Sequence, residues 1–319
     1  MVGDVVDRPP STWSGRRRAV VGAGIAMVLA TGMGMWTVNQ SCEASPAGSL
    51  SSRCPVSLPG GRGASTGSPT SPPPTVGLPV RSGVGVPEGV VLTDSGPLTI
   101  DVAGTVIDSA NVLGTVSILA DDVTVRRSRV TASAWSVIKV GAGVRGVRIE
   151  DVEVNGMGLK GQGGSAGIDG TATITRALIE GVENGVEPGD GSVIEGSIIR
   201  RLAAPGPDPH IDGIEIDGGS DILIRGNLVD LTEWDQTSTV MVDNYFAPVK
   251  RIRVEGNRLL GGGYTVYSDG RFKGGSMVDI SFVANRMVKG RWGYAAIAES
   301  DPVWVGNVDD LSGASIDRP

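Results

Sequence analysis

One short pattern recurs through the middle of the chain and limits the fold more than any other feature. Each copy has two apolar positions around a middle residue, then two more residues, a small or amide residue and another apolar position. A clear copy is Ile222-Leu-Ile224-Arg-Gly-Asn227-Leu-Val229. The central apolar residues of seven copies are Val125, Ile149, Ile174, Ile194, Ile224, Val254 and Phe282, which are 20 to 30 residues apart.

A repeat of this length, with apolar residues at alternate positions, predicts stacked coils of short β-strands. One coil cannot bury its inner face alone, but stacked coils bury a continuous column of Val and Ile. Asn227, Asn257 and Asn285 share one position of the repeat. We expect a corner there, because Asn tolerates left-handed backbone angles. The pattern therefore predicts an all-β fold, a single-stranded right-handed parallel β-helix, over residues 86–307.

These coils resemble the right-handed parallel β-helix of the pectate lyase-like superfamily. The runs 100–107 and 116–125 resemble the first coils of such domains. The resemblance covers residues 86–307 and implies the fold. It leaves the activity open, because the superfamily contains lyases, hydrolases, epimerases and non-catalytic adhesive domains.

The chain before the repeats has a different composition. Residues 1–18 are polar and end in three arginines, and residues 19–38 carry no charge. A basic flank before an apolar run predicts an apolar helix that serves as an export signal or as a membrane anchor. Residues 39–85 are rich in Ser, Pro and Gly and predict a disordered linker. We expect an exported protein, either secreted or tethered to the outer face of the membrane by residues 19–38.

Overall charge narrows the class of partner. The net charge of −7 argues against nucleic acid, because nucleic-acid binding needs a basic surface. The same charge disfavours a polyanionic glycan unless a cation bridges the two. We expect a monomer that binds a polysaccharide or a cell-surface glycan, with a flexible tail at residues 308–319.

Three long connections predict one rim of a groove, because insertions in solenoids gather on one face. They span residues 155–167, 203–210 and 231–239, and Lys160 in the first is a candidate substrate-binding residue. Four aromatic residues follow the strand centres at an offset of ten: Trp135, Trp234, Tyr264 and Trp292. They predict either a row of flat faces for sugar rings or an aromatic stack that stabilises a corner.

The single histidine ends the second of these connections, in Asp208-Pro-His210-Ile-Asp212. A neighbouring carboxylate orients the ring and raises its proton affinity, as a general base or acid requires. Asp-Pro-His resembles the catalytic motif of mannuronan C5-epimerases. The resemblance assigns Asp208 and His210 and implies an Asp and a Tyr on neighbouring coils, for which Asp243 and Tyr245 are candidates. The alternative is a structural histidine that closes the loop onto Asp212.

Four acidic residues each follow an apolar residue of the second strand in a coil: Asp169, Glu187, Asp217 and Asp243. Stacked coils would place these carboxylates about 5 Å apart, where they repel one another unless a cation lies between them. Oxygen ligands favour Ca²⁺, which lyases of the superfamily use to bridge an acidic cleft to uronate carboxylates. The alternative is ordinary turn chemistry, since Gly or Pro follows three of the four.

Two functions from different classes fit these residues. The first is an enzyme that cleaves or epimerises a uronate in an extracellular polysaccharide, with His210 exchanging the proton beside the sugar carboxylate. A hydrolase with two carboxylates, Asp212 and Asp243, is a variant of it. The second is a non-catalytic glycan-binding or adhesive solenoid at the cell surface.

Overall fold

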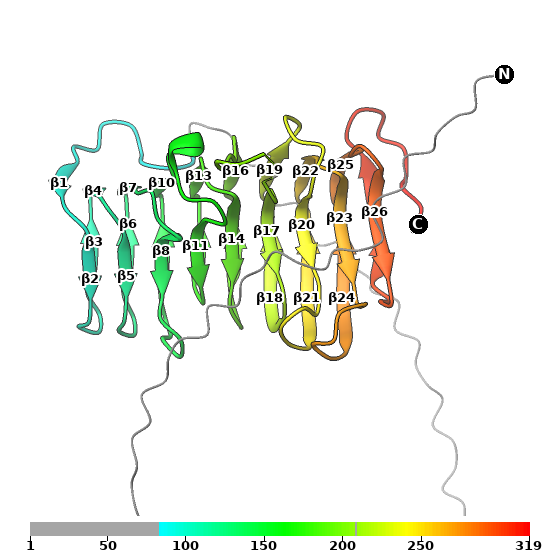
Figure 1. Cartoon of the computed structure of the whole chain (residues 1–319), viewed down its shortest axis with the longest axis horizontal. Coiled ribbons are helices and arrows are strands. Elements are labelled where there is room, and N and C mark those ends of the chain that lie inside the picture. The colour runs from blue at the N-terminus through cyan, green and yellow to red at the C-terminus, as the bar shows by residue number, and fades with distance from the viewer. Residues whose placement is uncertain (1–82, 208) are drawn as a thin grey trace, which may run out of the picture. The chain divides into compact units, whose positions relative to one another are not determined.

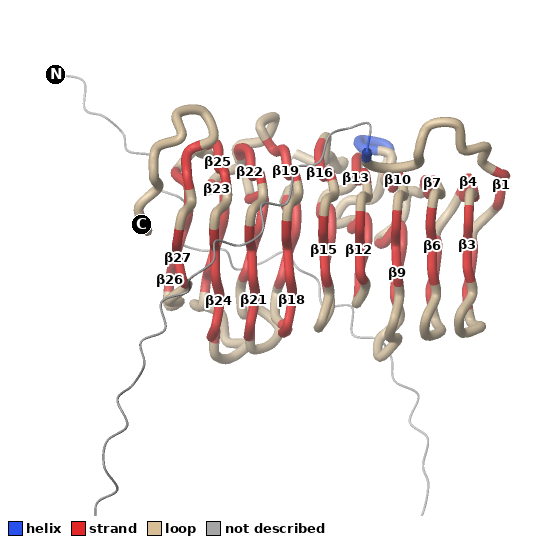
Figure 2. Tube along the Cα trace, turned by 180° about the vertical axis from the view of Figure 1, so that it is seen from behind, coloured by secondary structure: helices blue, strands red, loops and turns tan. Residues whose placement is uncertain are grey.

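The computed structural model describes residues 83–207 and 209–319. The basic region 1–18, the signal or anchor 19–38 and most of the linker lie outside the described residues. The described chain forms an all-β parallel β-helix, as the repeat predicts. Successive coils pair in parallel in three sheets (Figure 1). Figure 2 shows the same stacking from the opposite side.

Within the described residues, each coil passes through sheet A, then sheet B, then sheet C. Sheet A has the order β1 (Thr93–Ser95), β4 (Ala110–Leu113), β7 (Arg129–Thr131), β10 (Glu153–Asn155), β13 (Leu178–Glu180), β16 (Ile198–Arg200), β19 (Leu228–Leu231), β22 (Arg258–Gly261), β25 (Arg286–Val288) and β28 (Val308–Asp309). Sheet B has the order β2 (Leu98–Ile100), β5 (Val116–Ile118), β8 (Ser136–Val140), β11 (Ala166–Gly170), β14 (Asn184–Pro188), β17 (Asp212–Ile216), β20 (Ser238–Val242), β23 (Tyr264–Asp269) and β26 (Gly293–Ala298). Sheet C has the order β3 (Val106–Asp108), β6 (Thr124–Arg126), β9 (Arg148–Glu150), β12 (Thr173–Thr175), β15 (Val193–Glu195), β18 (Gly219–Arg225), β21 (Val249–Glu255), β24 (Met277–Val283) and β27 (Val303–Val305).

The predicted apolar column is confirmed in sheet C. All seven central residues pair in register from one coil to the next and are 0% exposed: Val125, Ile149, Ile174, Ile194, Ile224, Val254 and Phe282. Burial of such a column supplies the apolar stabilisation of a repeat that has no separate core in any single coil.

The three repeated asparagines form a buried ladder at the corner between sheets C and A. The backbone N–H of Asn227 donates to Asn257 Oδ1 (2.9 Å), and the same contact joins Asn257 to Asn285 (3.0 Å). The Asn257 side-chain amide also donates to the Ile224 carbonyl (2.9 Å) and to Asn285 Oδ1 (3.0 Å). The corner was predicted correctly, but its cause was not: the left-handed residue is the one before each asparagine, such as Gly256 (φ 63°). The asparagines instead satisfy buried backbone groups.

The C-terminal residues 308–316, for which the sequence predicts a flexible tail, pack against the last coil. Val308 forms an antiparallel bridge with Ser315, and Ile316 is 8% exposed. The indole N–H of Trp304 donates to the Ile316 carbonyl (2.8 Å), and Asp310 pairs with Arg258 (2.8 Å). This segment covers the end of the apolar column.

Helix content is small in the described residues. A 3-10 turn spans Gly158–Lys160 in the connection between β10 and β11. None of the helices within residues 83–207 and 209–319 has the length and apolarity that crossing a bilayer requires.

Loss of one ladder member should cost measurable stability. Asn257→Ala removes two side-chain donors and the acceptor of the Asn227 N–H, all in a buried corner. We expect urea unfolding to show a loss of about 1–3 kcal/mol. The control, Asn111→Ala, removes one exposed hydrogen bond to Asp94 and should cost less than about 0.5 kcal/mol. Equal losses for the two variants would contradict a stabilising ladder.

Candidate functional site

The outer face of sheet B carries the candidate site, and a local irregularity in three strands shapes that face. A Cβ placed on Gly213 would collide with Val229 Cγ1, in the interior beneath sheet A, while the next residue, Ile214, is 0% exposed. Two consecutive residues therefore face inward, and Asp212 and Glu215 share the opposite, outward face. This departs from strict alternation in the manner of a β-bulge.

The same irregularity recurs in the two preceding coils. A Cβ on Gly167 would lie 2.7 Å from Ile179 Cγ2, and one on Gly185 would lie 2.6 Å from Ile199 Cγ2, both under sheet A. The residues on either side of each inward pair then face outward together. Register places Asn184 beside Asp212 in one outward column. A second column contains Lys139, Asp169, Glu187 and Glu215, as the pairings of β8, β11, β14 and β17 require.

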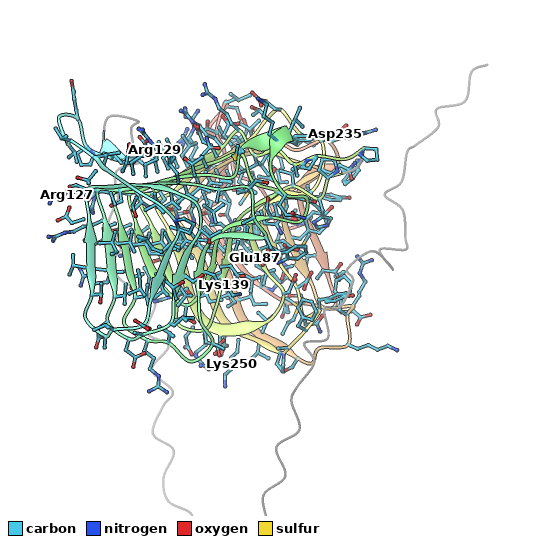
Figure 3. All side chains as sticks on the ribbon, turned by 60° about the vertical axis from the view of Figure 1, so that its left-hand side comes forward. Arg127, Arg129, Lys139, Glu187, Asp235 and Lys250 are labelled. Atoms are coloured by element: carbon cyan, nitrogen blue, oxygen red, sulfur yellow. The ribbon has the colours of Figure 1, made fainter. Side chains whose placement is uncertain are left out.

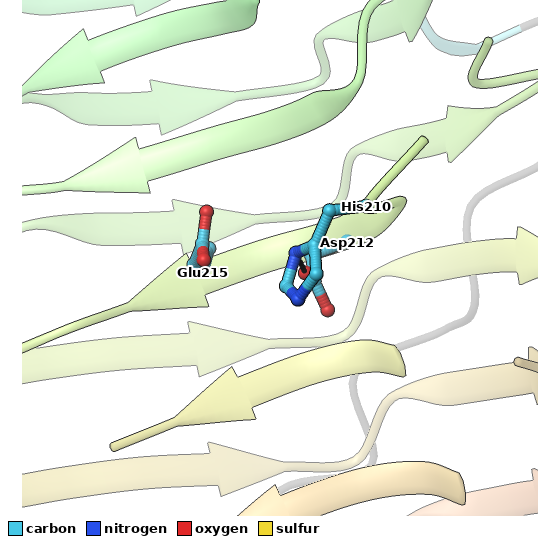
Figure 4. A group of neighbouring side chains, drawn as sticks. All are labelled: His210, Asp212 and Glu215. Atoms are coloured by element: carbon cyan, nitrogen blue, oxygen red, sulfur yellow. Dashed lines mark ion pairs between the residues drawn. The ribbon is translucent and has the colours of Figure 1, made fainter. Parts of the chain in front are cut away.

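His210, Asp212 and Glu215 meet at the start of β17 (Figure 4). His210 Nδ1 lies 2.8 Å from Asp212 Oδ2. One nitrogen or carboxylate oxygen from each of the three residues lies within 4.8 Å of the others. The histidine side chain is 29% exposed, whereas that of Asp212 is 0% exposed. A buried carboxylate therefore lies beside a ring that solvent reaches, and the role of orienting that ring stays a prediction.

Hydrogen bonds from neighbouring coils hold this group in position. Asp212 Oδ1 accepts from the Ser238 hydroxyl (2.8 Å) and the Ser238 N–H (3.1 Å). The backbone N–H of His210 donates to Glu183 Oε1 (2.5 Å). The side-chain amide of Asn184 donates to Glu187 Oε1 (2.8 Å) and also to Glu215 Oε2. The side chains of Asp212 and Glu215, and the backbone of His210, are thus each anchored through an adjacent coil.

A buried tyrosine adds a protonated hydroxyl to this face. Burial, with contributions from Asp212, Tyr264 and Asp269, raises the pKa of Tyr267 well above its usual value. Tyr267 is 8% exposed and contacts the Tyr264 ring edge-on, with centroids 5.5 Å apart. Its phenol remains neutral where an ordinary tyrosine begins to ionise.

The other predicted catalytic residues lie elsewhere. Asp243 forms a β-bridge with Asp269 at the C-terminal ends of the sheet B strands, whereas His210 lies beside their N-terminal ends. Asp217 lies beside Asp243 on the adjacent strand. It follows Asp212 by five positions, a distance along the strand of roughly 16 Å at 3.3 Å per residue. Tyr245 follows Asp243 and packs against Phe246 (4.7 Å between centroids). The structure therefore separates Asp243 and Tyr245 from His210, and it also separates the proposed hydrolase pair. Asp208 lies outside the described residues.

The predicted acidic ladder is divided between two columns. Glu187 is in register with Glu215, not with Asp217, because Val186 pairs with Ile214. Asp217 and Asp243 form a separate column with Asp269. Asp169 accepts a hydrogen bond from Ser136 (2.9 Å) and pairs with Lys139. Figure 3 shows Lys139 and Glu187 on this face of the molecule.

A hollow of about 350 Å³ nevertheless joins three of the four predicted acids. Asp169, Glu187 and Asp217 line it together with Glu215 and Phe246. Asp243 is not among its lining residues. The hollow offers several carboxylate oxygens, the ligand type that Ca²⁺ prefers, although Lys139 already pairs with Asp169.

The four predicted aromatic residues do not form one row. Trp292 and Tyr264 are in contact, with ring centroids 5.8 Å apart. Trp234 is half-buried, and its indole N–H donates to the Leu202 carbonyl (2.8 Å). Trp135 is 60% exposed and lies four coils from Trp234, about 19 Å at 4.8 Å per coil. The chain runs from the strand centres in sheet C through sheet A to sheet B, and the connection between sheets A and B varies in length, so an equal offset in sequence is not an equal register.

The three long connections do share one corner, between sheets A and B. A Cβ on Gly163 would lie 3.5 Å from the Pro205 carbonyl oxygen, so the first and second connections are neighbours. The Thr237 N–H donates to the Ile211 carbonyl (2.8 Å), which joins the second to the third. Lys160 is exposed in the first connection, whose Gly164 N–H donates to Glu183. These connections flank His210 at the edge of sheet B.

Comparison with known proteins adds no assignment. No family model matches the chain, and no match was found among curated proteins or solved structures.

Sequence reasoning missed Glu215, Glu183 and Asn184. A signal for Glu215 is present: Ala166-Gly-Ile-Asp169, Asn184-Gly-Val-Glu187 and Asp212-Gly-Ile-Glu215 repeat one pattern of four residues. Alignment on the glycine gives the observed register, whereas alignment on Ile216 shifts the third copy by two residues. No comparable signal marks Glu183, because the residues in register with it on the adjacent coils are not acidic.

The inward-facing glycine should not accept a side chain. Gly213→Ala would force a methyl group against Val229 and the Thr239 carbonyl oxygen. We expect a loss of about 1–3 kcal/mol in denaturant unfolding, because the added volume overpacks the interior. Gly96→Ala is the control, since a Cβ there meets nothing within 4 Å. An unchanged midpoint for Gly213→Ala would contradict the inward orientation.

Proposed function

We propose that this protein is an exported β-helix that acts on a uronate-containing polysaccharide, by lysis or by epimerisation. The observation that carries the proposal is the 2.8 Å pair between His210 Nδ1 and the fully buried Asp212. A carboxylate this close to Nδ1 favours the tautomer with its proton on Nδ1, which leaves the Nε2 lone pair as the basic site of a neutral ring. This arrangement suits the exchange of a proton at carbon, as the Asp-Pro-His resemblance to mannuronan C5-epimerases implies.

In the proposed reaction, Nε2 of His210 takes the proton beside the uronate carboxylate. Elimination then breaks the bond to the leaving glycosidic oxygen, which takes a proton from water, and gives an unsaturated sugar. In an epimerase, the carbanion instead regains a proton on its opposite face. The neutral phenol of Tyr267 is near Asp212 and supports the second route as a proton donor on the same face of sheet B.

The uronate carboxylate must be neutralised for the carbanion to form. The proposed groups are Lys160 in the first connection and a Ca²⁺ ion in the acidic hollow. Glu187, Glu215 and Asp217 provide the oxygen ligands there. A cation is needed on this face because Glu183, Glu187 and Glu215 would otherwise repel a polyanion.

The proposed direction of the polysaccharide is along the edge of sheet B where the strands begin. Trp135 precedes β8, and His210 precedes β17, three coils along the axis. The separation is about 14 Å at 4.8 Å per coil. Between them lies the connection that carries Lys160 and contacts Glu183. We propose that the glycan runs along this edge, parallel to the axis of the β-helix. Export of the protein through residues 19–38, as a cleaved signal or an anchor, would bring the protein to such a substrate.

The catalytic proposal is tested with polymannuronate and polygalacturonate, with and without Ca²⁺. Ultraviolet absorbance detects unsaturated ends, and proton NMR detects inverted residues. We expect His210→Gln to lower the rate by at least about 100-fold, because general-base groups contribute that much or more. Lys250→Ala, an exposed residue on sheet C, should keep full activity. Silence in both assays with both polymers would refute the uronate chemistry.

A second function, non-catalytic glycan binding, rests on one observation: Trp135 exposes 60% of its surface beside Gly164. A flat exposed indole can stack on a sugar ring. Trp135→Ala should then weaken glycan binding about tenfold without a change in melting temperature. Val303→Ala, exposed on sheet C, should leave binding unchanged. A lower melting temperature with intact binding would assign Trp135 a structural role.

A further inference from the structure

The group at the start of β17 combines ligand types that a general acid–base pair does not need. Within residues 83–207 and 209–319, His210, Asp212 and Glu215 are the one group of three such side chains whose ligand atoms converge within 4.8 Å. One imidazole and two carboxylates converge here, in contrast to the carboxylate-lined hollow nearby. An ion with ligand bonds of about 2.0–2.2 Å would hold these atoms roughly 3–3.5 Å apart. The widest of these separations must therefore close by about 1.3–1.8 Å for an ion to be bound.

The environment of the three side chains resembles that of metal ligands. The remaining oxygen of Asp212 accepts two hydrogen bonds from Ser238, and Glu215 accepts one from Asn184. Such outer contacts orient ligands toward an ion and fix which oxygen binds it. Asp212 and Glu215 are 0% and 3% exposed, so both are already withdrawn from water. His210 is accessible enough to admit an ion.

A second observation points to a ligand at the same place. Asn184 is 7% exposed and lies beside Asp212 in register, while its amide nitrogen bonds Glu215. Among the described residues, nothing donates a hydrogen bond to its buried carbonyl oxygen, Oδ1. A buried oxygen of this kind is costly unless a cation or a bound water satisfies it.

We propose that His210, Asp212 and Glu215 bind a divalent transition-metal ion, with Zn²⁺ as the reference ion. Imidazole with carboxylates suits Zn²⁺ and its neighbours, whereas Ca²⁺ and Mg²⁺ favour all-oxygen sites. The inference does not depend on the polysaccharide chemistry. An ion held by Nδ1 leaves the proton on Nε2, so His210 then has no basic nitrogen. Bound Zn²⁺ therefore blocks the proposed proton exchange.

The test is calorimetric titration of the full chain with ZnCl₂. Cys42→Ser and Cys54→Ser are included, so that the two thiols of the chain do not compete for the ion. We expect one saturable site and a rise in melting temperature on binding. His210→Gln and Glu215→Gln should each lower the affinity at least about tenfold. The control, Asp217→Asn, alters the neighbouring hollow and should change the affinity less than about twofold.

A direct readout avoids reliance on variants that fold poorly. The chain has one histidine, so its ring resonances identify His210 without ambiguity. Proton NMR should show these resonances shift and saturate with Zn²⁺, and remain in place with Ca²⁺. Absence of saturable Zn²⁺ binding would overturn the proposal. So would binding that leaves the histidine resonances unmoved, or that Asp217→Asn removes and His210→Gln retains.

Discussion

Each coil of this molecule must turn at the same corners as the coil beneath it, because otherwise the parallel pairing of the strands would lose register. Turning buries backbone N–H and carbonyl groups that no strand can satisfy. At the corner between sheets C and A, asparagine side chains meet this need from coil to coil, from Asn227 through Asn285. Toward the N-terminus, Ser128 and Ser197 fill the same role at this corner through their hydroxyl groups. Coils of very different length can then stack on one frame.

That frame allows insertions at one corner without loss of pairing elsewhere. The three long connections all leave sheet A and return to sheet B. There the inward-facing glycines bring the strands close to sheet A, and residues three apart share the outer face. Asp212 and Glu215 owe their proximity to this departure from strict alternation. The site therefore depends on Gly213 as much as on its charged groups, although the glycine touches none of the reacting atoms.

The sequence predicts the buried column well because period-two alternation and stacking act together on the same residues, such as Ile194 and Ile224. The pair of His210 and Asp212 was also predictable, since two residues so close in sequence remain close in any strand. Contacts between coils were predictable only where the connecting chain has a constant length. The segments that precede Trp135 and Trp234 belong to connections of different length, so their relative positions were not predictable. The same holds for Asp243 relative to His210. The position of Glu215 was missed for a different reason. Strict alternation of inward and outward residues ignores a local bulge, which only the repeated glycine reveals.

The last described residues have a consequence for association between molecules. A stack of parallel strands presents unpaired backbone groups at each end, and such edges recruit further strands. Here the chain folds back beyond β28, so that Val308 pairs with Ser315 and Ile316 covers the apolar interior. A strand arriving from another molecule would find this edge of sheet A already occupied. Such a strand would have to displace residues 308–316 before it could pair there, so the closing segment protects this one edge of the solenoid.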